Sequence, residues 1–414
     1  MTSFAIQSFG CRVNQAEAFL WSDELQNYGM KYVNDFYDSD LVVINTCTIT
    51  NRADRDVRSF IRKVLRLNSE AKLIVTGCFA EQAEKEFENN PKISYFIRNS
   101  EKKNLVPLIV SSRKKIKEPK IVPYRSRALV KIQDGCDFRC SFCVIPSVRG
   151  KSISVEKDKI IPQIKEFVHR GFKEITLTGI HLCLYGLDLK PRSSLLELLK
   201  DIELLEGLKK IRLTSLDPRL LNWDLLKYIT SSKKICPHFH LSLQHASDNI
   251  LLRMGRRISI EDYQVILAFL RKNSPLSSIG ADIMVGFPGE SNDDFDRTYD
   301  FLEKSPLTYF HVFSYSPRKR TEAASWKQVN NKIKKERSAL LRELSKKKNM
   351  DFRRKFSGKE CTGIVISRGS SESQILTSNY FKVFVPYCPF EKKEEVRLRI
   401  ENVTETRTEG QIIT

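Results

Sequence analysis

The chain has 414 residues, of which 41% are hydrophobic, and its formal net charge is +20 with a pI near 9.5. This length is sufficient for two or three domains. A chain of this size can bury a full hydrophobic core without stabilisation by disulfides or metal ions. The excess of Lys and Arg favours a polyanionic partner, most often nucleic acid.

Two kinds of targeting segment are missing from the sequence. No stretch reaches the roughly 18 apolar residues of a membrane span, and the opening MTSFAIQSFG lacks the basic start and apolar run of a secretory signal. We therefore expect a cytoplasmic protein without membrane contact, whose ten cysteines are reduced. Such cysteines are better read as metal ligands and buried thiols than as a disulfide framework.

The N-terminal part alternates strand-like and helix-like segments. We expect strands over 4–11, 40–47 and 71–78, and helices over 14–29 and 52–68. This β-α-β-α-β order indicates a parallel sheet. We assign residues 1–111 to an open parallel α/β domain.

A basic run that contains Pro but no apolar period follows at 112–127, and we interpret it as a linker. Beyond it, six short apolar strands alternate with helices. The strands are expected within 127–136, 173–182, 209–218, 237–247, 278–290 and 307–318, and the helices within 156–170, 194–207, 247–255, 260–272 and 291–304. This order predicts a full or partial (β/α) barrel over 128–350, with its chemistry where the strands end. A long basic helix is expected at 331–355.

The last segment, 351–414, changes character. It reads as short alternating strands with turns between them, in ECTGIVIS, SQILTSNY, FKVFVPY and EEVRLRIENVTETR. This pattern is typical of a small β-barrel.

Three cysteines are crowded into DGCDFRCSFC (134–143), at the end of the first predicted barrel strand. Cys136, Cys140 and Cys143 have the spacing C-x3-C-x2-C. A structural zinc site takes four ligands and a 4Fe–4S cube normally takes four thiolates, so three would leave one iron open. The alternative is a zinc site that borrows a fourth ligand from His181, Cys183 or a distant residue.

A second trio consists of Cys11, Cys47 and Cys78, each of which ends a predicted parallel strand. The carboxyl ends of parallel strands meet at one edge of a sheet, so these thiols should converge there. The alternative is three ordinary core cysteines, but these would scatter along their strands. The remaining cysteines are interpreted as small apolar residues: Cys183, Cys236, Cys361 and Cys388.

These motifs resemble those of a known family. The C-x3-C-x2-C loop, with Phe142 before its third Cys, resembles the cluster loop of radical S-adenosylmethionine (SAM) enzymes. GCRVNQAE, NTCTITNRAD and TGCFAEQ resemble the methylthiotransferase domain, and the tail is similar to TRAM, an RNA-binding module. The similarity covers essentially the whole chain in the same domain order. Within the family, GCRVNQ, NTCTIT and KIQDGCDFRCSFC are most similar to the tRNA threonylcarbamoyladenosine methylthiotransferase group.

The resemblance implies a transferase that places a methylthio group on carbon 2 of an adenosine beside the anticodon, where the adenosine already carries an N6-threonylcarbamoyl group. It implies two 4Fe–4S clusters, one for each cysteine trio, and SAM at the open iron of the loop cluster. A carbon radical suits this reaction because no ordinary general base removes an unactivated C–H proton. The expected partners are the anticodon stem–loop of tRNA and an electron donor such as flavodoxin or ferredoxin, and we expect a monomer.

The resemblance also points to SAM contacts. Gly179 lies where a glycine-rich strand end meets the methionyl amine, and Phe142 belongs to the cluster loop. Polar contacts to the ribose are expected from Ser242 and Gln244, and the strand with Ile283 and Val285 is expected to lie along the adenine.

RNA contacts are expected from three basic runs, 52–66, 112–127 and 331–355, although any one such run is by default a solvated face. Aromatic candidates for base stacking, with core packing as the alternative, are Tyr380, Phe381, Phe384 and Tyr387. We assign catalysis to none of His181, His240, His245 and His311.

Three other functions remain open. One related branch modifies an aspartate of a ribosomal protein and usually has Pro-Lys-Asn after the first Cys, where this chain has Arg12-Val13-Asn14-Gln15. A second branch acts on isopentenyladenosine in tRNA and typically has Gln-Met-Asn there. The third alternative is a non-catalytic RNA-binding protein stabilised by zinc or an iron–sulfur cluster.

Overall fold

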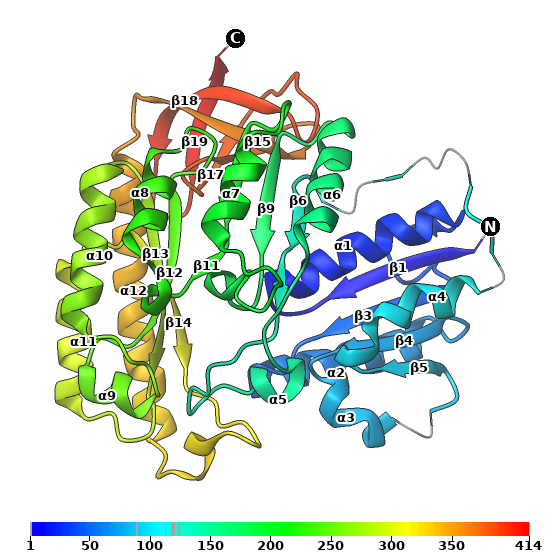
Figure 1. Ribbon diagram of the computed structural model, residues 1–414, viewed down its shortest axis with the longest axis horizontal. Coiled ribbons are helices and arrows are strands. Elements are labelled where there is room, and N and C mark those ends of the chain that lie inside the picture. The colour runs from blue at the N-terminus through cyan, green and yellow to red at the C-terminus, as the bar shows by residue number, and fades with distance from the viewer. Residues whose placement is uncertain (1, 88–89, 112, 117–120, 123–124, 414) are drawn as a thin grey trace.

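The computed structural model describes residues 2–87, 90–111, 113–116, 121–122 and 125–413. It contains an N-terminal parallel sheet, a central partial barrel and a small C-terminal β-barrel (Figure 1). The linker predicted at 112–127 lies partly outside the described residues. No described helix is both long and apolar enough to cross a bilayer.

The N-terminal sheet has five parallel strands in the order β2-β1-β3-β4-β5. Its elements are β1 (Ser3–Ser8), α1 (Arg12–Asn27), β2 (Lys31–Tyr32), β3 (Leu41–Thr46), α2 (Asn51–Leu67), β4 (Lys72–Gly77), α3 (Ala80–Phe87), β5 (Ile93–Ile97) and α4 (Leu105–Val110). Helices α1 and α4 cover one face and α2 and α3 the other, which explains why β3 is buried at every position. The three strands and two helices expected here are confirmed. The short edge strands β2 and β5 and the helices α3 and α4 were not predicted.

Six parallel segments form the central partial barrel, in the order β6-β9-β10/β11-β12-β13-β14. Its strands are β6 (Ala128–Lys131), β9 (Glu174–Thr178), β10 (Lys210–Leu213), β11 (Ser215–Leu216), β12 (His238–Gln244), β13 (Ser278–Val285) and β14 (Tyr309–Ser314). The main helices are α6 (Lys157–His169), α7 (Leu195–Glu203), α8 (Trp223–Ser231), α9 (Asp248–Arg253), α10 (Ile260–Asn273) and α11 (Asn292–Lys304). All six predicted strands are present, and α8 is the one main helix that the sequence analysis missed.

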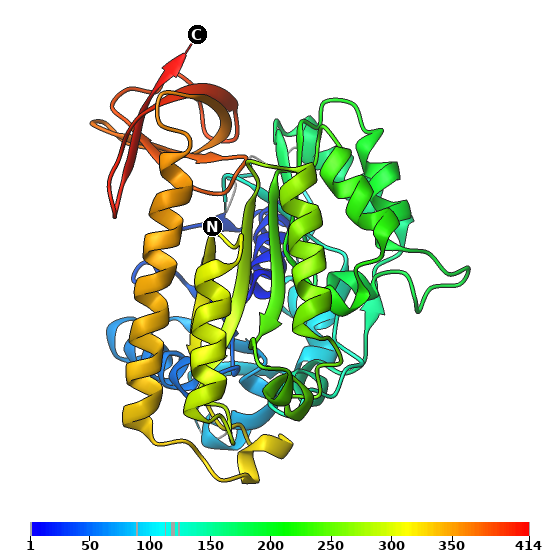
Figure 2. The same ribbon diagram turned by 90° about the vertical axis from the view of Figure 1, so that its left-hand side faces the viewer.

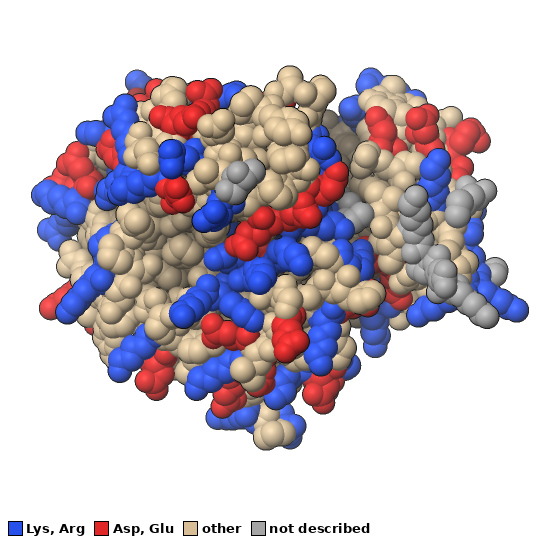
Figure 3. Space-filling view, turned by 90° about the horizontal axis from the view of Figure 1, so that it is seen from above, with Lys and Arg blue, Asp and Glu red and all other residues tan. Residues whose placement is uncertain are grey.

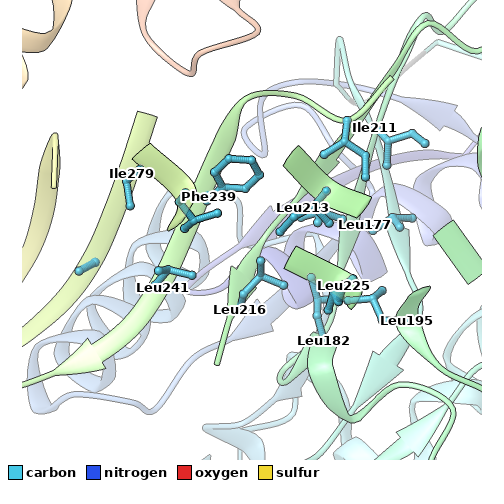
Figure 4. Close-up of a cluster of buried hydrophobic side chains, with 14 of the residues drawn as sticks. Leu177, Leu182, Leu195, Ile211, Leu213, Leu216, Leu225, Phe239, Leu241 and Ile279 are labelled. Atoms are coloured by element: carbon cyan, nitrogen blue, oxygen red, sulfur yellow. The ribbon is translucent and has the colours of Figure 1, made fainter. Parts of the chain in front are cut away.

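Side-chain alternation gives the barrel an apolar outer layer and a polar interior face. Ile211, Leu213 and Phe239 point into the core between strands and helices (Figure 4). Their neighbours Arg212, His238 and others therefore lie on the opposite face, because successive strand residues point to opposite sides. A barrel with polar groups inside is suited to bind a polar ligand.

The long helix α12 (Asn331–Arg354) runs along the open side of the barrel beside β14 and leads into the C-terminal barrel (Figure 2). Its last turn packs into that barrel through Phe352. The closed barrel has the order β15-β16-β17-β19-β18. Its strands are β15 (Glu360–Arg368), β16 (Ser373–Thr377), β17 (Lys382–Val385), β18 (Glu395–Val403) and β19 (Thr408–Ile413). The small β-barrel expected from the sequence is confirmed, with one more strand than the four segments expected.

Helix α1 attaches the N-terminal sheet to the central barrel. Phe19 is fully buried, and its ring lies 5.3 Å from that of Phe167 on α6 and 5.9 Å from that of Phe172, edge to face. Asp23, one turn further on, accepts hydrogen bonds from Arg170 at 2.5 and 3.2 Å. Through Phe19 the N-terminal domain therefore contributes to the hydrophobic core of the barrel.

We expect Phe19→Ala to lower the free energy of unfolding by about 3–5 kcal/mol, because it leaves a cavity between α1 and the barrel. Leu204→Ala, at a side chain that is 80% exposed, is the matched control and should change it by less than about 0.5 kcal/mol. Urea titration followed by circular dichroism measures both. Equal effects of the two substitutions would contradict a shared core.

Candidate functional site

The loop that carries Cys136, Cys140 and Cys143 is closed by a short antiparallel pair, β7 (Gln133–Asp134) and β8 (Ile153–Ser154). Gly135, just before the first Cys, has φ +68°, and a Cβ there would lie 1.9 Å from the carbonyl oxygen of Lys151. Only glycine permits this approach of the two ends of the loop. The loop therefore begins with its backbone fixed at the end of the first barrel strand.

Burial raises the pKa of two of the loop thiols. The pKa of Cys143 rises to about 12, and the pKa of Cys136 is raised as well. Such thiols stay protonated at neutral pH unless a metal displaces the proton. All three are free of disulfide bonds.

The second trio gathers at the carboxyl edge of the N-terminal sheet. Cys47 directly follows β3 and Cys78 directly follows β4, while Cys11 is the N-cap of α1. A Cβ at Gly10, which has φ +87°, would lie 2.5 Å from Cβ of Cys47, so glycine lets the two loops meet. Burial raises the pKa of Cys47 to about 12, and the neighbouring Cys78 and Cys11 thiols add to the rise. The predicted convergence of these thiols is present.

The thiol trios are less compact than a tetrahedral site for a single zinc ion. Among the described residues, one set of three Cys, His, Asp or Glu ligand atoms lies mutually within 4.8 Å, and it is His240, Asp282 and His311. Zn–S bonds of about 2.3 Å in a tetrahedral site would bring the sulfurs about 3.8 Å apart. Neither thiol trio is that compact, and neither forms such a set with His181 or Cys183. A four-iron cube holds its thiolates further apart than a single ion does, so the spacing of the trios does not conflict with that group.

Arg149 connects the two thiol trios. It ends the short helix α5 (Ile145–Arg149), which follows the cluster loop, and its side chain is 1% exposed. Its Nε lies 3.2 Å from Sγ of Cys78, and its Nη1 donates a hydrogen bond of 2.7 Å to Asp134. The same guanidinium donates to Oδ1 of Asn14, whose Oδ1 is 3.9 Å from Sγ of Cys11. One buried cation thus contacts Cys78 directly, Cys11 through Asn14, and the strand pair that carries the loop thiols.

Glu17 on α1 compensates this cation. Its carboxylate lies 2.5 Å from Nζ of Lys102, 3.1 Å from Nζ of Lys131 and 3.4 Å from Nη1 of Arg149. Burial opposes ionisation of Glu17, but the three cations outweigh it and hold the pKa of this carboxyl well below its usual range. We call Glu17, Lys102, Lys131, Asp134 and Arg149 the bridging network.

The predicted SAM-contact residues surround the carboxyl ends of the barrel strands. Gly179 follows β9, and a Cβ there would lie 2.9 Å from Oε1 of Gln133, so the strand end is closely packed. Ser242 hydrogen-bonds Ser215 on the neighbouring strand. Gln244 ends β12 with φ +82°, an unusual backbone for a residue other than glycine. Ser242 and Gln244 share β12, which is separated from β9 by β10 and β11.

The side chains of the remaining predicted SAM-contact residues are engaged in packing. Ile283 and Val285 are fully buried in the outer core, so their backbone alone can face a ligand in the barrel. Phe142 packs edge to face against Phe287, with ring centroids 6.5 Å apart, and holds the loop against the end of β13.

Sequence reasoning missed the residues that surround the loop. Phe138 is stacked on His181 with ring centroids 5.2 Å apart, and the guanidinium of Arg219 lies 3.9 Å from the centroid of Phe138. Asp217 accepts hydrogen bonds from Arg219 and lies 3.0 Å from Nε2 of His181. The Asp217-Pro218-Arg219 sequence directly after a strand was the available signal, because chemistry was expected at strand ends.

The surface seen from the side of the C-terminal barrel carries Lys and Arg side chains spread among Asp and Glu (Figure 3). The four aromatic candidates for base stacking lie in different environments. Phe381 is core, Phe384 lies under Arg407, Tyr387 is 73% exposed, and Tyr380 points toward the central barrel. Tyr387 is therefore the candidate with a free ring face.

The comparisons with known proteins agree with this geometry. Residues 3–97 match the family described as "Uncharacterized protein family UPF0004", and residues 130–302 match the "Radical SAM superfamily". The "Threonylcarbamoyladenosine tRNA methylthiotransferase MtaB" of Aquifex aeolicus is 38% identical over 397 residues, which are 92% of this chain and 95% of that protein. The protein of the same name from Chlamydia pneumoniae is 34% identical over 99% of this chain and 98% of its own length.

Among solved structures, the radical S-adenosylmethionine methyltransferase TsrM from Kitasatospora setae superposes with a TM-score of 0.57. It is 14% identical and covers 78% of this chain and 77% of its own, a likeness that concerns the fold.

A radical SAM barrel joined to a sheet of this kind defines the class of the protein. The chain belongs to the radical SAM methylthiotransferase family, in the group of the threonylcarbamoyladenosine tRNA methylthiotransferases.

Gly135→Ala should distort the cluster loop, because both the left-handed backbone and the contact with Lys151 oppose a Cβ. We propose that this loop holds one of two four-iron clusters, so iron bound after anaerobic reconstitution should fall by about half. Gly358→Ala is the matched control, since Gly358 has φ +74° and its Cβ would meet nothing within 4 Å, but it lies outside the loop. If the control loses as much iron, the close approach at Gly135 is not what matters.

Proposed function

We propose that the chain transfers a methylthio group to carbon 2 of N6-threonylcarbamoyladenosine beside the anticodon of tRNA. The enzyme is a radical SAM transferase of sulfur-containing groups that acts on tRNA. The observation that carries the proposal is the pair of three-thiol sites held together by Arg149.

Two 4Fe–4S clusters and SAM are the cofactors. We infer that Cys136, Cys140 and Cys143 hold the first cluster, and that Cys11, Cys47 and Cys78 hold the second. When bound, the first cluster and SAM supply the radical chemistry that removes the hydrogen of carbon 2, and the second cluster supplies sulfur.

The chain itself positions and shields the reactants. In this proposal Gly179, Ser242 and Gln244, with the backbone at Ile283 and Val285, would orient SAM at the barrel mouth. Phe142 fixes the cluster loop against β13. The bridging network keeps the two sites in one geometry, which a transfer between them needs.

The division of labour along the chain is part of the proposal. Residues 1–111 would hold the second cluster, 128–350 the SAM chemistry, and 351–414, a TRAM-like barrel, would bind RNA after the linker 112–127. The substrate base has to leave its stack to reach the barrel. We infer a cytoplasmic monomer that binds the anticodon stem–loop and takes electrons from a flavodoxin or ferredoxin.

Two cysteine variants should separate the two sites. Cys140→Ala removes a ligand of the first cluster, so reductive cleavage of SAM should fall at least a hundredfold, as measured by release of 5′-deoxyadenosine. Cys47→Ala should leave that cleavage within about threefold of wild type but abolish methylthio transfer to tRNA.

A buried cysteine that belongs to neither trio is the matched control. Cys388→Ala should leave both activities unchanged, because Cys388 is buried in the core of the C-terminal barrel. SAM cleavage that survives Cys140→Ala would overturn the assignment of the first cluster.

The substrate nucleoside is tested in cells. Deleting the gene should remove 2-methylthio-N6-threonylcarbamoyladenosine from tRNA, as read by nucleoside mass spectrometry, and should leave 2-methylthio-isopentenyladenosine unchanged. The opposite pattern would assign the chain to the isopentenyladenosine branch.

A further inference from the structure

Three arginines meet at the N-terminal end of the barrel interior. Arg212 lies on the interior face of β10, Arg127 directly precedes β6, and Arg12 reaches in from the first residue of α1. They influence one another electrostatically: the Arg212 and Arg12 cations both disfavour the charge of Arg127. We call them the arginine cluster.

The arginine cluster carries more positive charge than the described residues compensate. Arg212 makes a bidentate pair with Glu174, with N···O distances of 2.8 and 2.9 Å, and Arg127 lies 3.6 Å from the same carboxylate. Within the described part of the chain, Arg12 forms no ion pair; its guanidinium donates to Gln15 at 3.0 Å and to Tyr380 at 2.6 Å. Arg side chains stay charged in proteins, so one carboxylate faces three cations.

The groups around the arginine cluster do not supply the missing charge. His238 is stacked on Tyr380 with ring centroids 4.1 Å apart, and burial with the nearby Arg212 cation holds its pKa well below its usual value. Tyr309 bridges His238 and His240 at 2.8 and 3.1 Å, and burial raises its pKa, so it stays neutral. Asp282 is engaged with His240 and His311. A half-buried cation without a counter-charge is costly, which favours an anionic ligand.

Tyr380 fixes Arg12 in place. It comes from the turn after β16 with φ +69°, and Arg212 donates to the carbonyl oxygens of Thr377 and Ser378 in the same turn, at 3.2 and 3.1 Å. The C-terminal barrel thereby closes the N-terminal end of the central barrel. Toward the other end, the interior residue His311 is 55% exposed, so this face is open to solvent there.

Arg12 directly follows Cys11 of the second trio in the chain. An anion on its guanidinium would therefore be held by the residue next to a thiol of that trio. We propose that Arg12, aligned by Tyr380, binds the carboxylate of the N6 substituent of the substrate adenosine. A guanidinium matches a carboxylate in a planar, two-bond geometry.

This inference rests on the proposed function and adds a specificity determinant to it. An adenosine with an apolar N6 group would leave Arg12 unpaired, and a site built for a polar group rejects such an analogue strongly. Arg12 is a binding residue in this account, and Tyr380 a positioning residue.

The test uses reconstituted holoenzyme without reductant and two anticodon stem–loop RNAs. One carries N6-threonylcarbamoyladenosine and the other its methyl ester, which lacks the negative charge. By fluorescence anisotropy, wild type should bind the carboxylate RNA at least about tenfold more tightly than the ester. Arg12→Gln should bring this ratio close to 1 by weakening the carboxylate RNA alone, and Arg12→Lys should keep part of it.

Two further variants serve as controls. Lys304→Gln removes one charge from a side chain that is 77% exposed on α11, and should keep the wild-type ratio. Tyr380→Phe removes the hydroxyl that orients Arg12 and should lower the ratio several-fold, without touching the neighbour of Cys11. If Arg12→Gln binds less iron than wild type, the ratio measured for Tyr380→Phe still tests the role of Arg12.

The inference is overturned if wild type binds both RNAs equally, or if Arg12→Gln weakens both to the same extent, as loss of a phosphate contact would. Failure of the proposed function looks different: with SAM and reductant added, wild type would not methylthiolate the threonylcarbamoyl RNA at all. Methylthiolation of that RNA with an unchanged ratio in Arg12→Gln refutes the role of Arg12 alone.

Discussion

The buried guanidinium of Arg149 is the constraint on which the rest of the site depends. It contacts Cys78 on one side and Asp134 on the other, so the N-terminal sheet and the cluster loop cannot shift independently. Removing one member of such a buried network leaves an uncompensated charge and typically costs 3–5 kcal/mol. Glu17 compensates the positive charge of the network, because its carboxylate lies close to all three cations. The geometry between the two thiol trios is thus maintained by electrostatics as well as by packing.

The three parts of the chain meet at helix α1. Its apolar face enters the core of the barrel through Phe19, while Glu17 joins the bridging network and Arg12 reaches the barrel interior. The C-terminal barrel reaches the same interior through Tyr380. The contact of the C-terminal barrel with the inside of the central barrel couples the positions of these two domains.

Much of the fold was predictable because it rests on local patterns. Alternating apolar strands and helices predicted the parallel sheet and the barrel, and strand-end cysteines predicted that Cys11, Cys47 and Cys78 would meet. The two-residue strand β2 gave no signal, because two residues carry no period. Side-chain pairs between domains were also out of reach: Arg149 and Cys78 are 71 positions apart, and Arg12 and Tyr380 are 368 apart. Such pairs depend on how the finished domains dock, which no local period encodes.

The central claim is that two incomplete thiol cages each hold an iron cube. Iron and acid-labile sulfide analysis of anaerobically reconstituted protein tests it most directly, on wild type and on variants that lack one trio each. The account predicts about eight irons and eight sulfides per chain in wild type, and about four of each when either trio is replaced by alanine. Bound zinc without labile sulfide, or a trio whose removal changes no iron, would contradict it.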